Sequence, residues 1–86
     1  MACLHLIFSQ AGAISCLEVA AEADTLLLIV DGVYLALTET GIPMLAIAAD
    51  VNSRGLASRI TNNLRLIDYP EMVDQVAGHT PVISWH

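Results

Sequence analysis

The sequence contains no lysine, and its only permanently charged cations are Arg54, Arg59 and Arg65. The formal net charge at pH 7 is -6. Without lysine the chain cannot form a Schiff base or supply the lysine of a P-loop. Nucleic-acid binding needs a basic surface, which three arginines hardly provide. We therefore expect no direct contact with nucleic acid.

Long apolar runs are also missing. No uninterrupted run exceeds six residues, which is far too short to span a membrane. No basic segment precedes the first apolar stretch, as a secretory signal would require. We therefore expect a cytoplasmic protein without membrane contact. In that compartment Cys3 and Cys16 should be free thiols rather than a disulfide.

Motifs for metals and phosphates are absent as well. The sequence has no C-x-x-C pair and no glycine-rich phosphate loop. His5, His79 and His86 lie far apart, without the spacing of zinc ligands. We expect these histidines to be structural or surface residues, and we expect neither a metal nor an organic cofactor.

Apolar residues, by contrast, are abundant. They make up 56% of the 86 residues, against about 45–50% in typical domains. The length is that of one domain, residues 1–86. A domain this small buries only about 60% of the surface that its unfolded chain exposes. Surplus apolar surface usually becomes a subunit interface, so we expect an oligomer or a complex.

The apolar segments alternate with helical patterns. The segments expected to be strands are residues 3–8, 25–30, 43–48, 64–67 and 82–85. Helices are expected at 16–23, about 33–39 and 70–77, with a short turn at 51–58. Strands that are apolar on both faces are typical of buried parallel sheets. The pattern therefore predicts an α/β fold, a small three-layer sandwich with a mostly parallel sheet of about five strands.

The stretch "AISCLEVA" predicts the start of the first helix. Ser15 and Glu18 form an S-x-x-E capping box, and Ile14 and Val19 occupy the positions of a hydrophobic staple. Cys16 would then be the first helical residue, where the peptide dipoles lower the pKa of a thiol. Cys16 is thus predicted to be the more reactive thiol. The alternative is a packed, inert cysteine.

Position in the sheet adds to this hypothesis. A helix start after a strand lies at the carboxyl edge of the sheet, where open α/β sheets keep their sites. Asp31 and Gly32, which follow the second strand, should reach the same edge as Cys16. Asp31 could orient a group near Cys16 or cap the following helix. Cys3 begins the first strand at the opposite edge, where core packing is the better interpretation.

Several stretches together resemble the DsrH/TusB family. They are "LH" at 4–5, "SCLEVA" around Cys16, "LLLIVDGVYLAL" at 26–37, "SRGL" at 53–56, "IDYPEMVDQV" at 67–76 and the terminal "ISW". The resemblance implies a DsrE/F/H-type fold and a complex with DsrE/TusD-like and DsrF/TusC-like chains. It implies sulfur relay as a persulfide, either for thiolation of the tRNA wobble uridine or in dissimilatory sulfur oxidation.

The resemblance also bears on the site. Cys16 matches the position at which one branch of the family carries its thiol, so it is the candidate persulfide carrier, with Ser15, Asp31 and Gly32 as supporting residues. Alone, the chain would cover its apolar face by self-association. The alternative is a non-catalytic subunit whose partner carries the working cysteine, and whether this chain is itself an enzyme stays open. A small-molecule binding module that uses the crevice at the sheet edge is a further alternative.

Overall fold

The computed structural model describes residues 2–60 and 64–86. The strands are β1 (Leu4–Ile7), β2 (Thr25–Leu28), β3 (Met44–Ile47), β4 (Arg65–Ile67) and β5 (Val82–Trp85). The α-helices are α1 (Gln10–Leu17), α2 (Ala48–Ser53) and α3 (Tyr69–Ala77), and the 3₁₀ helices are η1 (Val30–Leu37) and η2 (Ala57–Arg59). Within these residues no helix is long and apolar enough to cross a membrane.

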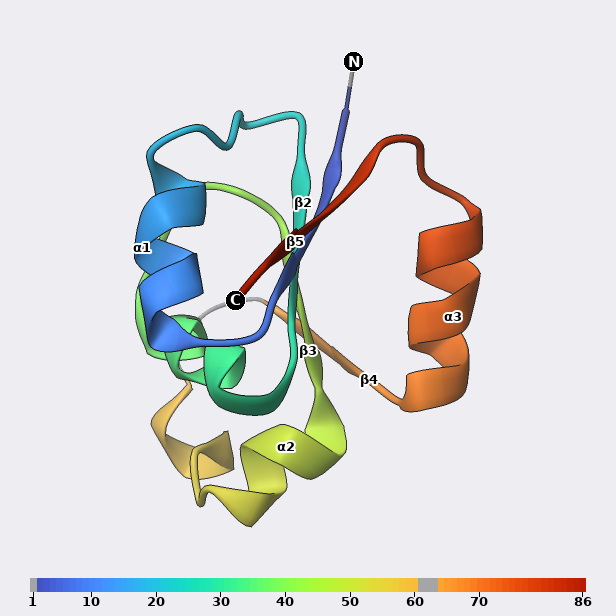
Figure 1. Cartoon of the computed structure of the whole chain (residues 1–86). Coiled ribbons are helices and arrows are strands. Elements are labelled where there is room, and N and C mark those ends of the chain that lie inside the picture. Colours follow the sequence, from blue (N-terminus) through green and yellow to red (C-terminus); the bar gives the residue numbers. More distant parts are fainter. Residues whose placement is uncertain (1, 61–63) are drawn as a thin grey trace.

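The strands form one five-stranded sheet in the order β4-β3-β2-β1-β5, and every pairing is parallel. Figure 1 shows α1 on one side of the sheet and α3 on the other. The expected α/β class and parallel sheet with helices on both faces are confirmed. All helices that follow strands begin at the carboxyl ends of those strands, as parallel connections require.

The central strands are buried on both faces. Along β2, Leu26 and Leu28 point into the core beneath α1 and η1, whereas Leu27 points into the core beneath α3. Met72 and Val76 of α3 pack against the second core. This arrangement explains the continuous apolar run of β2, because a strand with two covered faces has no solvent-facing positions.

The first helix differs from the sequence-based prediction. α1 begins at Gln10, and its N-cap is Ser9, whose Oγ accepts the Gly12 N–H at 2.9 Å. The prediction of a capping box at Ser15 is therefore wrong. Glu18 is the C-cap of α1 and not a residue of its first turn. The physical reason is packing, because starting at Ser9 turns a stripe of small buried residues toward the sheet. That stripe is Gly12, Ala13 and Cys16.

The other elements shift less. Strand ends differ from the expected ones by at most two residues, as is usual for element boundaries, and β5 has the expected bounds. The helix expected at 33–39 is η1, which starts three residues earlier, at Val30. The turn expected at 51–58 is resolved into α2 and η2. α3 begins one residue before the expected 70–77, capped by Asp68, whose carboxylate accepts the Glu71 N–H at 2.9 Å.

The two capping assignments predict opposite mutational effects. Replacing Ser9 by Ala removes an N-cap acceptor and should lower the free energy of unfolding by about 1 kcal/mol. Replacing Ser15 by Ala, at an exposed position inside α1, should leave it nearly unchanged. Urea unfolding followed by circular dichroism measures both. A larger loss for Ser15→Ala than for Ser9→Ala would contradict the observed helix start.

Candidate functional site

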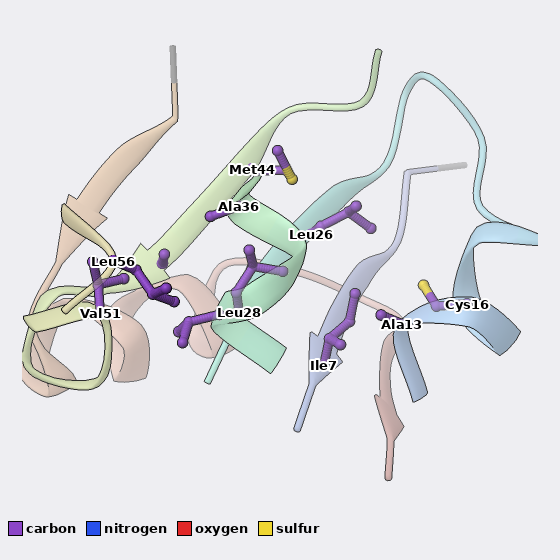
Figure 2. Close-up of a cluster of buried hydrophobic side chains, with 11 residues drawn as sticks. Ile7, Ala13, Cys16, Leu26, Leu28, Ala36, Met44, Val51 and Leu56 are labelled. Atoms are coloured by element: carbon purple, nitrogen blue, oxygen red, sulfur yellow. The ribbon is translucent and has the colours of Figure 1, made fainter. Parts of the chain in front are cut away.

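Cys16 lies in the last turn of α1 and has no exposed surface. Figure 2 shows it on α1 near Ala13, with Ile7 and Leu26 on the adjacent strands. Burial, and to a smaller extent the charge of the nearby Asp24 carboxylate, raise the pKa of the Cys16 thiol from 9.0 to about 11. The prediction of a thiol activated at a helix start is therefore wrong.

The predicted site residues are also not brought together. α1 starts at the carboxyl end of β1 and runs back, so its last turn lies toward the amino edge. Asp31, by contrast, lies in the first turn of η1 at the carboxyl edge, where its carboxylate pairs with the Arg54 guanidinium at 2.9 Å. Ser15 is exposed on α1. The prediction that Cys16 lies at the carboxyl edge is thus wrong. Asp31 and Gly32 lie at that edge, as predicted.

Gly32 has a packing role. A Cβ at this position would lie 1.9 Å from the Ile7 carbonyl oxygen, so η1 can approach β1 closely only because residue 32 lacks a side chain. Asp31 does not cap η1, whose N-cap is Ile29. Of the "DG" pair, Gly32 is thus the residue that lets η1 pack closely against β1.

A hydrogen-bonded network at the carboxyl edge centres on Asp50 of α2. Its Oδ2 accepts the Val30 N–H at 2.8 Å and the Tyr69 hydroxyl at 3.0 Å. The bond to this carboxylate raises the pKa of Tyr69. Val30 has φ of 53°, which is unusual for a β-branched residue, and the Asp50 bond holds it there. Sequence reasoning missed Asp50 and Tyr69, because only the fold brings α2 and α3 to this edge.

A second network joins β1, β5 and the loop before β2. The Trp85 indole N–H donates to His5 Nδ1 at 3.0 Å, and His5 Nε2 lies 2.9 Å from Asp24 Oδ2. Asp24 also accepts the backbone N–H groups of Cys3 and Ala21, each at 2.9 Å. Because indole N–H is only a donor, Nδ1 must accept and the ring proton sits on Nε2. His5 is thus a buried neutral imidazole with both nitrogens engaged.

The same network contains the group of potential metal ligands found in the described residues. Ligand atoms of Cys3, His5 and Asp24 lie within 4.8 Å of one another. A metal on Nε2 would place the ring proton on Nδ1, facing the Trp85 N–H. Metal-bound histidines instead donate that proton to an acceptor. The surroundings therefore suit a hydrogen-bonded network and do not suit a metal.

The buried Asp24 carboxylate makes the free energy of unfolding depend on pH in the acidic range. The N–H groups of Ala21 and Cys3, and then the His5 ring, lower the pKa of Asp24. A lowered folded pKa means that the contribution of Asp24 to the free energy of unfolding is complete at neutral pH. It is lost as pH falls below about 4, the ordinary pKa of aspartate, toward the folded value.

Asp24→Asn should therefore flatten the acid limb of the stability curve. The variant should be less stable than the parent at pH 7, and its stability should fall less between about pH 5 and pH 2 because position 24 no longer titrates. Urea titrations at several pH values measure this, with Asp74→Asn on the exposed side of α3 as the control. Parallel curves for the parent and Asp24→Asn would contradict the role of Asp24.

Comparisons with known proteins cover most of the chain. Residues 8–82 match the family described as DsrH like protein. Protein TusB of Pectobacterium parmentieri is 32% identical over 73 residues, covering 74% of this chain and 77% of that protein. Protein TusB of Escherichia coli is 33% identical over 78 residues, covering 80% and 82%.

A solved structure is also similar to this chain. The solution NMR structure of protein Tm0979 from Thermotoga maritima superposes with a TM-score of 0.66 at 28% identity. The alignment covers 94% of this chain and 97% of that one. The likeness therefore extends across the sheet and its helices. The sequence and structural matches together show that the chain belongs to the DsrH/TusB family.

Proposed function

We propose that this chain is a non-catalytic subunit of a heteromeric sulfur-relay complex, in which a partner chain carries the working cysteine. Membership of the DsrH/TusB family supports the place in such a complex. The burial of Cys16 carries the choice of role, because its side chain has no exposed surface and its pKa is raised to about 11.

Persulfide transfer needs a thiolate that can reach a sulfur atom of its partner. A pKa of about 11 in place of 9.0 lowers the thiolate fraction of Cys16 at neutral pH by roughly a hundredfold. A bound sulfane sulfur would also enlarge a side chain that is already packed between α1 and the sheet. Both effects favour Cys16 as a core residue.

The proposed partners are the DsrE/TusD-like and DsrF/TusC-like chains. The reaction they serve is thiolation of the tRNA wobble uridine or dissimilatory sulfur oxidation. The net charge of -6 supports contact with tRNA through those partners rather than through this chain. The competing hypothesis, in which Cys16 is the persulfide carrier, rests on its match to the thiol position of one family branch, and the next experiments decide between the two.

Alkylation should distinguish the two thiols. Cys3 is partly exposed and Cys16 is buried, so iodoacetamide near neutral pH should label Cys3 first. Mass spectrometry of partly alkylated protein gives the order, and protein unfolded in urea should show similar rates at both positions. Faster labelling of Cys16 in the folded chain would support an activated thiol and oppose the proposal.

Sulfur transfer tests the role directly. In a complex reconstituted with the two partner chains, Cys16→Ala should transfer sulfur as the parent does, because its thiol takes no part in the chemistry. Radioactive sulfur passed to the final acceptor measures this, with Cys3→Ala as the matched control. If Cys16→Ala assembles normally but transfers no sulfur, Cys16 is the carrier and the proposed role is wrong.

A further inference from the structure

α1 lacks the charged outer face that a surface helix normally has. Its sequence, "QAGAISCL", contains no charged residue. Cys16 and Ala13 face the core, while Ile14 on the outer side is 67% exposed and Leu17 is 37% exposed. Val19, just beyond the helix, is 65% exposed. Only Gln10 and Ser15 are exposed polar residues of this helix, so the exposed Ile14, Leu17 and Val19 leave an apolar strip along α1 that a second layer of protein could cover.

This outer face forms one wall of an open groove. The groove has a volume of about 170 Å³ and runs between α1 and η1. Its lining residues are Gln10, Ala13, Ile14, Leu17, Tyr34, Leu35 and Thr38. No charged side chain is among them, and a cleft of this size fits one aliphatic or aromatic side chain of a binding partner. We call it the α1–η1 groove.

Acidic residues gather at one end of the α1–η1 groove. Both helical elements begin at the carboxyl ends of parallel strands, so both end toward the same edge of the sheet. Glu18 directly follows the lining residue Leu17, and Glu39 follows the lining residue Thr38. Glu22 is exposed in the loop after α1. This end of the groove is therefore negative.

The cations of the chain lie elsewhere. Arg54 caps α2, Arg59 ends η2 and Arg65 begins β4. Arg54 pairs with Asp31, and Arg65 pairs with Glu71. A second copy of this chain therefore has few positive groups to place against the acidic end, and its net charge of -6 opposes such a contact.

We propose that the α1–η1 groove is the docking site for a subunit of the sulfur-relay complex, which inserts an apolar side chain flanked by lysine or arginine. This inference rests on the proposed function and adds the place and the chemistry of the contact. The apolar anchor displaces water from Ile14 and Leu17, and the cations pair with Glu18 and Glu39 at the rim. Such a division into apolar centre and charged rim is typical of protein interfaces.

Two matched variants test the groove. Ile14→Asp places a charge in the groove, whereas Val73→Asp places one on α3, where the parent residue is 61% exposed. Each variant is coexpressed with tagged DsrE/TusD-like and DsrF/TusC-like chains from the same genome and purified through the tag. Ile14→Asp should be lost from the complex, and Val73→Asp should be retained. Circular dichroism and urea unfolding confirm that both variants fold.

Salt dependence tests the acidic rim. Binding of the parent chain to the isolated partners should weaken as ionic strength rises, since exposed charge pairs are screened. The double variant Glu18→Gln, Glu39→Gln should bind more weakly at low salt and lose much of this dependence. Biolayer interferometry across a salt series gives both values. Equal salt slopes for the parent and double variant would overturn the assignment of the rim.

Other results of these experiments separate a failure of the proposed function from a failure of the groove assignment. If the parent chain joins neither partner, the proposed function fails, whatever the groove does. If Val73→Asp is lost and Ile14→Asp is retained, the partner binds over α3 and the groove assignment is wrong. If Ile14→Asp abolishes only self-association of the isolated chain, measured by light scattering, then the occupant is a second copy and the inference is overturned.

Discussion

The Asp24 carboxylate ties together parts of the chain that would otherwise be held only by apolar packing. It accepts N–H groups from Ala21 and Cys3, and through His5 it reaches Trp85. These contacts join the loop before β2 to the start of β1 and to the edge strand β5. A buried charge is tolerated only when its hydrogen bonds are satisfied, and here both oxygens are occupied. The order β2-β1-β5 is therefore supported by a polar network in addition to the two apolar cores.

The same carboxylate limits what Cys16 can do. Its negative charge adds to burial in raising the pKa of the thiol, so the arrangement that holds the sheet also keeps Cys16 protonated. The start of α1 at Ser9 has the same effect, because it places Cys16 in the last turn instead of the first. Stability of the fold and activation of this thiol thus oppose each other. A working thiol on a partner chain removes that conflict.

The sequence alone predicted the strands of the sheet, but it did not predict where the first helix begins. Runs such as that of β2 are apolar because both faces are covered, and this signal is local. The start of α1 is not a local property, since Ser9 and Ser15 are both good N-caps. Only the sheet distinguishes them, because Gly12 must lie against the backbone of Trp85, where a Cβ would come within 2.7 Å of its carbonyl oxygen.

The polar networks could not be read from the sequence for a related reason. His5 is 19 residues from Asp24 and 80 residues from Trp85. No rule of sequence spacing predicts that such residues meet. They meet because β1 pairs in parallel with both β2 and β5. The same holds for Asp50, which meets Val30 and Tyr69 only after α2 and α3 reach the carboxyl edge. Chemistry that depends on topology becomes visible only when the topology is known.

The error at the first helix also points to the interface. Ile14 and Val19 match the pattern of a hydrophobic staple, which gives two apolar side chains a contact within the chain. In the fold both are largely exposed, so that pattern has no intramolecular role. Apolar residues that serve no contact inside a small acidic domain reduce its solubility unless another protein covers them. The proposed contact with a partner subunit over α1 would account for the signal that misplaced the helix start.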